Sequence, residues 1–502
     1  MQRVHELVAR AAQDKPEGLA FINGDDRRIS WGAFQSAVED ARDDLVRFGV
    51  GPGDRVVIVL ENAIEVAAFY FAASHLDAAA VMVNARMSRP ELDRIVAHSD
   101  PSAVMFATDV SASAAAHAEA FGATPCTGRY GAVALWAREG SVAEPVFESG
   151  EEQVALLLYT SGTTGHPKAA MLTHANMIAA GRASADVRGM REGDMTFLAL
   201  PMSHIFGLVT VHAISLAQGS ARLEPVFDVA RLYTALQEDV TLLPAVPQMH
   251  AHLFHYARAH DMPRYDRGLL RYVSSGGAPL DPVWKREAEE FYGQTLQNGY
   301  GLTESAAGIC ATRNAMGDPD TSVGEAMLGA TIHIDLDAPG ATPAEGIGEI
   351  LVGGPQIMKG YFRDPEQTAA TLTEEGLLRT GDLGRFDDQG RLHIAGRTKE
   401  LIIRSGFNVY PVEVEAVLTE HPDVIIAGVV GRPVEGNEEV LAFVKAVPGS
   451  GLTEDALKDF LRARLTPYKR PERIIVADDL PAAPTGKILK AKLIETFQDR
   501  LG

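Results

Sequence analysis

The sequence predicts an α/β protein with a large N-terminal domain and a small C-terminal one. In the first 330 of its 502 residues, short runs rich in β-branched residues alternate with stretches whose apolar residues recur at helical spacing. Such alternation is typical of parallel or mixed sheets covered by helices. From there to residue 398, β-like pieces with glycine turns dominate, which predicts a β-rich subdomain. A smaller α+β pattern follows, so we expect the domains to span 1–398 and 399–502.

Local signals place individual elements of the N-terminal domain. The stretch 4–13 is expected to form a surface helix, not a membrane anchor. A second helix should begin after Ser30, because serine caps helices, apolar residues then recur at helical spacing, and glycine ends the stretch. Strands are expected at the apolar runs 55–60, 78–84 and 102–107, with helices between them.

The C-terminal unit shows similar signals on a smaller scale. A helix is expected at 412–422, strands at 424–430 and 439–447, and a further helix at 454–465. No Gly/Ser-rich linker precedes this unit, so a short hinge should join the two domains.

Composition and charge exclude several classes of function. The formal net charge of -21 would repel nucleic acids and anionic membranes. Cys126 and Cys310 are too few for a disulfide framework or a clustered zinc site, which favours a reducing compartment. The N-terminus lacks the apolar run of a secretory signal, and no segment is apolar for the length of a membrane span. We therefore expect a cytoplasmic protein with small-molecule partners and no integral membrane association.

The segment 159–168, YTSGTTGHPK, is the first candidate site. Its glycines let backbone amides turn toward an anion, its hydroxyl groups add donors, and its lysine adds charge. The spacing differs from that of the common P-loop, and the structural alternative is a polar turn between a strand and a helix. We favour a phosphate loop, with contacts to the anion from Thr160, Ser161, Gly162, Thr163, Thr164, Gly165 and Lys168.

This loop resembles the phosphate-loop signature of the adenylate-forming superfamily of acyl-CoA synthetases, luciferases and peptide-synthetase adenylation domains. Further motifs occur in the order in which that family carries them, and the resemblance covers nearly the whole chain, most closely to AMP-forming fatty-acyl-CoA synthetases. It implies ATP, Mg²⁺ and coenzyme A as reactants, and a mobile C-terminal lid. The motifs are LPMSHIFG (200–207), SSGGAPL (274–280), GYGLTES (299–305), GEILVGGPQIMKGYF (348–362), RTGDLG (379–384), GRTKELIIRSGFNVYP (396–411) and PTGKILK (484–490).

The resemblance implies roles for residues around the phosphates. Lys487 resembles the catalytic lysine that bridges the carboxylate and the α-phosphate, where positive charge is needed to bring two anions together. Glu304 resembles the magnesium ligand, with Thr160 as its partner at the metal, and oxygen donors suit that cation. Thr303 should contact the α-phosphate.

Other residues are expected around the nucleoside. Tyr300 should stack on adenine, and Asp382 should accept hydrogen bonds from both ribose hydroxyls. Arg397 should lie near the ribose and phosphate, although it and Asp382 would otherwise be read as parts of structural salt bridges. Lys399 is expected at the hinge about which the lid turns. The remaining expected contacts are Gly277, Ala278, Pro279, Asn298, Gly299 and Gly301.

The acyl and CoA sites are less well marked. His204 resembles the gate between the acyl pocket and the CoA tunnel, and the apolar stretch behind it lacks arginine and lysine. That composition favours an aliphatic or aromatic monocarboxylic acid over a dicarboxylate such as malonate. The acyl pocket is expected to include His204, Phe206, Gly207, Val211 and His212, and the CoA channel Ser405, Gly406 and Phe407. Basic residues that would meet the CoA phosphates, or serve only as solubilising charge, are Arg404, Lys469 and Arg470.

These observations predict an AMP-forming acyl-CoA synthetase that proceeds through an acyl-adenylate. The alternatives are a stand-alone adenylation enzyme that loads a carrier-protein thiol, a luciferase-like oxygenase, and a catalytically silent nucleotide-binding protein. The combination of Lys487, Glu304 and Asp382 speaks against the silent protein, which has no use for all three. A homodimer is a hypothesis based only on the size of the larger domain.

Overall fold

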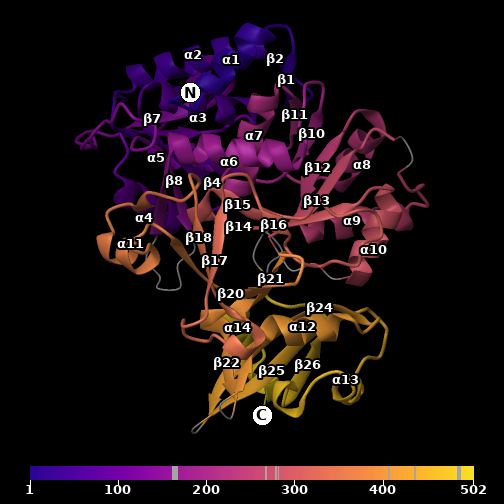
Figure 1. Ribbon diagram of the computed structural model, residues 1–502. Helices are drawn as coiled ribbons and strands as arrows, with labels where there is room; N and C mark the ends of the chain where they lie inside the picture. The colour runs from indigo at the N-terminus through magenta and orange to yellow at the C-terminus, as the bar shows by residue number, and fades with distance from the viewer. Residues whose placement is uncertain are drawn as a thin grey trace.

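The structure is a computed structural model, and it describes residues 1–160, 168–265, 268–277, 280, 282–404, 407–434, 437–482 and 488–501. Figure 1 shows a large body formed by the N-terminal two thirds of the chain, with the C-terminal domain at one end of it. None of the helices in the described part of the chain combines the length and the apolar character that a membrane crossing requires.

One sheet of the body has eight strands. Its central strands are parallel, and all six positions of Arg55–Leu60 are buried, which explains why residues 56–59 of this run are all β-branched. The strands predicted at 55–60, 78–84 and 102–107 are confirmed here. In spatial order the strands are β19 (Gly360–Tyr361), β9 (Lys168–Thr173), β8 (Val154–Thr160), β4 (Ala79–Asn84), β3 (Arg55–Leu60), β5 (Ala103–Phe106), β7 (Gly131–Ala137) and β6 (Thr124–Gly128).

The other sheet of the body has nine strands and is also mixed. Its middle strands pair in parallel, and its ends are antiparallel. In spatial order the strands are β16 (Glu325–Ala326), β15 (Ala307–Ala311), β14 (Leu296–Leu302), β13 (Tyr272–Gly276), β12 (Leu242–Ala245), β10 (Met195–Leu198), β11 (Ser220–Leu223), β1 (Leu19–Ile22) and β2 (Arg28–Ser30).

Helices pack on and between these sheets, and the helix predicted after Ser30 is confirmed. The Ser30 hydroxyl accepts a hydrogen bond from the Ala33 amide at 3.3 Å, as an N-cap should. Two helices, α6 and α7, lie between the two sheets (Figure 1), where one continuous apolar cluster forms the core. The helices of the body are α1 (His5–Asp14), α2 (Trp31–Arg47), α3 (Ile64–His75), α4 (Arg89–Ser99), α5 (Ala112–Phe121), α6 (His174–Val187), α7 (Ile205–Ala217), α8 (Val229–Glu238), α9 (Pro247–Ala259) and α10 (Pro282–Tyr292).

A four-stranded antiparallel sheet forms the β-rich subdomain that the sequence predicts after residue 330. One part of the expected subdomain belongs elsewhere, because β19 returns to the body and pairs with β9. In spatial order the strands of the subdomain are β17 (Thr331–Asp335), β18 (Gly348–Gly353), β20 (Leu378–Phe386) and β21 (Leu392–Arg397), and α11 (Pro365–Thr371) precedes β20 in the chain.

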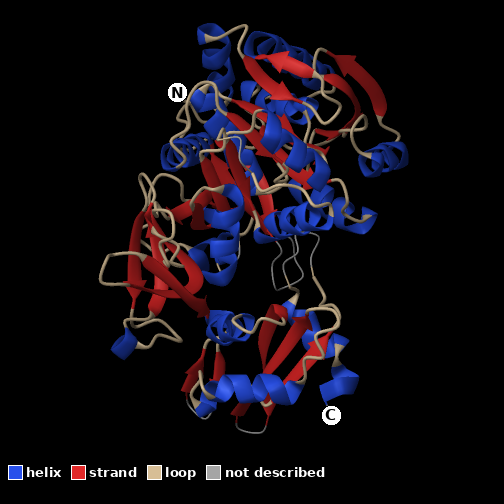
Figure 2. Ribbon diagram, turned by 90° about the vertical axis from the view of Figure 1, so that its right-hand side faces the viewer, coloured by secondary structure: helices blue, strands red, loops and turns tan. Residues whose placement is uncertain are grey.

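The C-terminal domain has apolar clusters of its own, built from residues beyond 400. In both views it lies below the body and beside the β-rich subdomain (Figures 1 and 2). The predicted helices and strands occur, and the boundary at Lys399 remains a proposal. The elements are β22 (Ile402–Arg404), β23 (Phe407–Val409), α12 (Pro411–Thr419), β24 (Val424–Val434), β25 (Asn437–Ala446), α13 (Glu454–Arg462), β26 (Arg473–Ala477), α14 (Lys490–Thr496) and α15 (Gln498–Leu501).

Candidate active site

The base of the expected phosphate loop is an antiparallel pair of strands. Thr160 ends β8 and is the cross-strand neighbour of Lys168, which begins β9. The segment between them therefore joins two strands, and not a strand to a helix. Ser161, Gly162, Thr163, Thr164 and Gly165 lie outside the described residues, so their contacts stay predictions.

Lys168 contacts two side chains from the segment between β18 and β20. Its ammonium group donates a hydrogen bond to the Gln367 side chain of α11 and lies 5.7 Å from the centre of the Tyr361 ring. The positive charge at the base of the loop is thereby held in place by two side chains.

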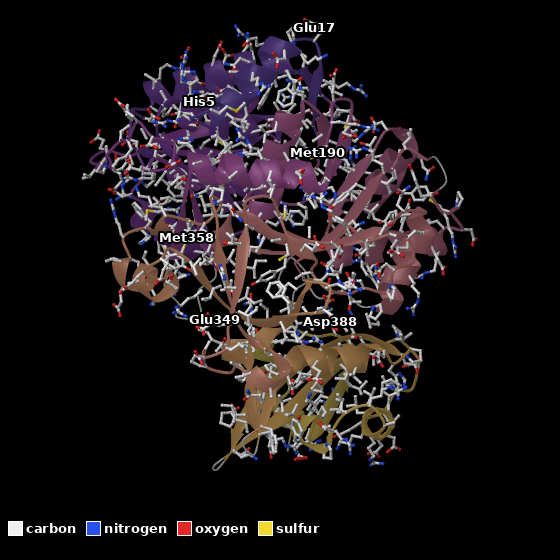
Figure 3. The ribbon with its side chains drawn as sticks, viewed as in Figure 1. His5, Glu17, Met190, Glu349, Met358 and Asp388 are labelled. Carbon is white, nitrogen blue, oxygen red and sulfur yellow. The ribbon has the colours of Figure 1, made fainter. Side chains whose placement is uncertain are left out.

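Glu304, the expected magnesium ligand, lies next to the same tyrosine. The Tyr361 hydroxyl donates a hydrogen bond of 2.7 Å to Oε1 of Glu304, and the Met358 amide donates to the Glu304 carbonyl at 2.9 Å. Met358 is labelled in Figure 3, where it lies between the body and the β-rich subdomain. Burial, and then the nearby Glu304 charge, raise the pKa of Tyr361 above its ordinary value, so the phenol remains a hydrogen-bond donor.

The donor set around Glu304 fits Mg²⁺. Among the described residues, no three histidine, cysteine, aspartate or glutamate side chains gather as a metal cluster. Mg²⁺ is commonly held by one or two carboxylates together with substrate phosphates and water. One carboxylate with one oxygen oriented by Tyr361, and a hydroxyl from Thr160, would hold the ion in that way.

Asp382 forms a second cluster, built across β20 and β21. Its carboxylate is 3% exposed, accepts a hydrogen bond from the Tyr300 hydroxyl and pairs with Nε of Arg397 at 3.0 Å. The turn before it is held by Glu349, labelled in Figure 3, whose carboxylate accepts from the Gly381 amide at 3.1 Å. The salt bridge that the sequence left open as an alternative role for these two residues is therefore present. A carboxylate fixed by two donors is also well placed to accept from ribose hydroxyls.

Tyr300 and Glu304 are four residues apart on one segment, which runs from the end of β14 into the short 3₁₀ turn Thr303–Ser305. This segment brings together the Asp382 cluster and the Glu304 cluster. Gly301 is required here, because a Cβ atom would lie 1.7 Å from the Ala307 carbonyl oxygen.

Two buried polar atoms lie just before the glycines of this site. Asn298 and Ser275 are neighbours on the parallel strands β14 and β13, and neither Oδ1 of Asn298 nor Oγ of Ser275 has a hydrogen-bond partner in the described part of the chain. Unpaired buried acceptors are uncommon in proteins. The two oxygen atoms are suited to accept hydrogen bonds from the amino group of a purine. Gly277 directly follows β13, and Gly299 follows Asn298 on β14. Ala278 and Pro279 lie outside the described residues.

At the expected acyl pocket, His204 and Phe206 open α7. Nδ1 of His204 accepts from the Phe206 amide at 3.3 Å, and the His204 side chain is exposed. The Phe206 ring lies against Gly276, where a Cβ atom would be 3.2 Å from it. Gly207 packs against the Pro201 carbonyl, and Val211 is fully buried.

His212 does not belong with these residues. Its side chain is fully buried, Nε2 lies 2.9 Å from the Tyr70 hydroxyl, and Nδ1 lies 3.2 Å from the Met177 carbonyl. Burial lowers the pKa of His212 from 6.5 to about 4, so the ring is neutral at pH 7. With both ring nitrogens occupied, His212 packs α7 against α3 and α6 and offers no hydrogen bond to a substrate.

The C-terminal domain contacts the β-rich subdomain near the expected hinge. Lys399 is exposed, and the Tyr410 ring packs against Ile347 and Leu383. The Tyr410 hydroxyl lies 2.8 Å from the Thr342 hydroxyl and 3.2 Å from the Gly340 carbonyl oxygen.

The basic residues considered for CoA are engaged by the protein itself. Arg404 pairs with Glu472, Lys469 with Glu413, and Arg470 donates to the carbonyls of Leu465 and Arg462. This arrangement does not support a role for them at the CoA phosphates. Phe407 is 55% exposed and stacks on Tyr468 at 4.7 Å, while Ser405, Gly406 and Lys487 lie outside the described residues.

Sequence reasoning missed two residues of this region. Tyr361 lies within the motif 348–362, but nothing in the motif indicates that its hydroxyl reaches Glu304. Arg188, directly after α6, places its guanidinium carbon 5.7 Å from the centre of the Phe206 ring, although it lies outside the apolar stretch from Ile205 that lacks basic residues.

Comparison with known proteins gives a consistent result along the chain. A family model described as AMP-binding enzyme matches residues 8–362, and one described as AMP-binding enzyme C-terminal domain matches residues 413–487. The long-chain-fatty-acid–CoA ligase FadD13 of Mycobacterium tuberculosis is 31% identical over 99% of this chain and 99% of its own.

Solved structures agree with these matches. The ATP-bound crystal structure of MatB from Rhodopseudomonas palustris superposes with a TM-score of 0.85 and 30% identity, covering 100% of both chains, whereas apo MatB gives a TM-score of 0.77. O-succinylbenzoate coenzyme A synthetase (MenE) from Bacillus subtilis, in complex with ATP and magnesium ion, gives a TM-score of 0.82 at 28% identity, covering 97% of this chain and 98% of its own.

Proposed function

The chain belongs to the family of AMP-binding enzymes, and from this premise we propose that it is an AMP-forming carboxylate–CoA ligase acting on an aliphatic or aromatic monocarboxylic acid. Support comes from relatives of nearly equal length whose names describe CoA ligases, one for long-chain fatty acids and one for o-succinylbenzoate. Because those acids differ in kind, the acid used by this chain depends on its own pocket.

The observation that carries the proposal is the segment from Tyr300 to Glu304. It joins a buried carboxylate suited to ribose, Asp382, to a carboxylate suited to a phosphate-bound cation. A nucleoside triphosphate has both groups in one molecule, with the ribose and the phosphates at a fixed separation. A protein that bound only AMP would have no use for the second carboxylate.

The first half-reaction forms the acyl-adenylate. A carboxylate oxygen of the acid attacks the α-phosphorus of ATP, and the bond from that phosphorus to the pyrophosphate oxygen breaks. Bound Mg²⁺ would supply charge neutralisation for the phosphates. Lys168 and Thr303 stabilise the phosphate oxygens, Asp382 orients the ribose, and Lys487 brings the carboxylate to the phosphorus.

The second half-reaction transfers the acyl group to CoA. The thiolate of CoA attacks the acyl carbon, and the bond from that carbon to the AMP oxygen breaks, which releases acyl-CoA and AMP. We propose that the C-terminal domain turns about Lys399 between the two steps. The better superposition on ATP-bound MatB than on apo MatB supports the interpretation that the arrangement described above is the adenylating one.

The proposal specifies CoA as the thiol that accepts the acyl group, and this choice can be tested directly. A carrier protein would also accept the acyl group from the same adenylate, so both acceptors should be offered. The cytoplasmic location and a homodimeric state also remain proposals, based on composition and size.

The proposed function is tested by pyrophosphate release with ATP, Mg²⁺ and a panel of acids, in the wild type and in two matched variants. Asp382→Asn removes the ribose carboxylate, and Asp388→Asn removes an exposed carboxylate from the turn of the same β20–β21 hairpin, labelled in Figure 3. We expect kcat/KM for ATP to fall by about 150-fold or more in the first variant only, because a hydrogen bond to a charged group contributes about 1.5–3 kcal/mol and Asp382 would make two. Equal activity in both variants would exclude this assignment.

A further inference from the structure

Arg188 is a buried cation that the mechanism above does not use. It is 8% exposed, and its Nη1 donates to the Ser184 carbonyl at 3.1 Å and to the Ser184 hydroxyl. Its Nε is buried and makes no hydrogen bond within the described residues, where Tyr272, and no carboxylate, is the ionisable group whose charge acts on it. Burial lowers the pKa of Arg188, but an arginine in a protein remains charged at neutral pH.

Other buried arginines of this protein are paired with acids. Arg55, 1% exposed, lies 3.5 Å from Asp100, and Arg222, 9% exposed, lies 2.9 Å from Asp239. A buried charge without such a partner costs several kcal/mol. A buried donor of this kind is therefore expected to serve a group that is not part of the chain.

The position of Arg188 identifies where that group lies. Side chains alternate along a strand, so Tyr272, Ser274 and Gly276 share one face of β13. Gly276 touches the Phe206 ring at one end of this face, and the Arg188 charge acts on the Tyr272 hydroxyl at the other, where it opposes the rise in the pKa of Tyr272 caused by burial.

The line from Phe206 to Arg188 therefore runs along β13, away from the place expected for the adenylate. Gly276 directly precedes the glycine loop of the nucleotide site, and Tyr272 lies four residues back, a distance of about 13 Å along a strand. The guanidinium carbon of Arg188 lies 5.7 Å from the centre of the Phe206 ring. Met190, labelled in Figure 3 two residues beyond Arg188, is partly buried and packs against the core of the body.

We propose that Arg188 lies at the far end of the acyl pocket and donates a hydrogen bond from Nε to an oxygen acceptor at the end of the acid remote from the reacting carboxylate. The inference rests on the proposed function and specifies its substrate: an acid with an apolar body and a terminal hydroxyl, carbonyl or carboxylate oxygen. It revises the expectation that the pocket contains no basic side chain, because that expectation considered only α7 and the residues after it.

The test compares acids matched in length that differ only at the far end. One series is hexanoate, 6-hydroxyhexanoate and adipate, and another is cinnamate and 4-hydroxycinnamate. In the wild type, kcat/KM from pyrophosphate release should be at least 10-fold higher for an oxygenated member than for its plain partner. Arg188→Met should abolish that preference and leave the plain acid unchanged or improved. A preference for adipate over 6-hydroxyhexanoate would show that the oxygen bound by Arg188 belongs to a carboxylate. A preference for 6-hydroxyhexanoate would show that it belongs to a neutral group.

Two further variants serve as controls for Arg188→Met. Arg182→Met removes an exposed arginine from α6, the helix that Arg188 directly follows, and should leave the preference intact. Arg188→Lys retains a buried cation, so it reports on the preference even where the methionine variant is too unstable to assay. The proposal is overturned when plain and oxygenated acids are used equally by the wild type, or when the preference survives in both Arg188 variants.

Failure of this inference can be told apart from failure of the proposed function by a binding readout. Acids that raise the Tm of the wild type do so without any turnover. When no acid releases pyrophosphate, the proposed function is wrong. A Tm increase with oxygenated acids that is lost in Arg188→Met would still support the subsite, and equal increases for plain and oxygenated acids would refute it.

Discussion

Replacing Tyr361 with phenylalanine should raise the Mg²⁺ concentration at which the enzyme is half-saturated. The change removes one hydroxyl group, which donates to Oε1 of Glu304 at 2.7 Å, and keeps the ring that lies beside Lys168. The Glu304 carboxylate would then lose the donor that fixes its orientation toward the cation, while the packing around the ring is preserved.

The size of the effect follows from the kind of hydrogen bond that is lost. A hydrogen bond to a charged acceptor contributes about 1.5–3 kcal/mol, and Glu304 is only half-buried, so the lower end applies. A loss of about 1.5 kcal/mol corresponds to a roughly 12-fold weaker site. Loss of groups that orient metal ligands elsewhere weakens metal binding about 10- to 100-fold, which agrees with this figure.

The assay is pyrophosphate release as a function of free Mg²⁺ at saturating ATP and acid. Tyr130→Phe provides a matched control, because Tyr130 also donates to a carboxylate, that of Asp44, in a part of the body remote from the site. The control should lower stability and leave the Mg²⁺ dependence unchanged. An unchanged or lower half-saturation concentration in Tyr361→Phe would refute the assignment of Tyr361 as a positioning residue for Glu304.

Three further predictions concern the lid, the core and the catalytic lysine. Tyr410→Phe removes the hydroxyl that lies 2.8 Å from the Thr342 hydroxyl and joins the C-terminal domain to the β-rich subdomain. Because the C-terminal domain should then turn more easily, thioester formation from supplied acyl-adenylate should become about 5-fold faster in rapid-quench measurements. A slower or equal rate would contradict this. Because burial lowers the pKa of His212 to about 4, the unfolded chain binds more protons between pH 6.5 and 4, and the wild type should lose about 3 kcal/mol of stability over that range from this group. His212→Gln should lower Tm, remove that contribution and leave the relative kcat/KM values of different acids unchanged; a change in acid preference would restore His212 to the pocket. Lys487→Ala should lose acyl-adenylate formation but largely keep thioester formation from supplied acyl-adenylate, and equal loss of both would contradict the division of roles.

Most of the fold could be predicted because its signals are local. Residues 56–59 are β-branched and apolar since both faces of their strand are covered, and Ser30 caps its helix with its own hydroxyl. The β-rich subdomain was predicted from its glycine turns, but the return of β19 to the body depends on pairing with β9, which lies nearly 200 residues earlier. No local pattern contains that information.

The same distinction applies to the site. The motifs assigned Tyr300, Glu304 and Asp382 to one site, and the structure brings Tyr300 and Asp382 into contact, while their roles stay predictions. They did not reveal the contacts that orient these groups, because each involves residues distant in sequence, 82 positions apart for Tyr300 and Asp382 and 57 for Glu304 and Tyr361.

His212 and Arg188 illustrate the limit for single side chains. A histidine in an apolar helix is compatible with either a pocket or a core position, and the Tyr70 hydroxyl that decides the matter is 142 residues away. Arg188 directly follows the end of α6 and looks like an ordinary helix-terminal arginine in the sequence. Only the packing of α6 and α7 between the two sheets brings it to Phe206.

The proposed reaction is tested most directly by identifying, by mass spectrometry, the products formed from ATP, Mg²⁺, CoA and a panel of acids. The panel should run from acetate to palmitate and include benzoate, cinnamate, malonate and the oxygenated acids above. We predict AMP and an acyl-CoA in equal amounts, with an acyl-adenylate when CoA is omitted. Formation of ADP, or of an acyl-adenylate that passes to a carrier protein and never to CoA, would contradict it.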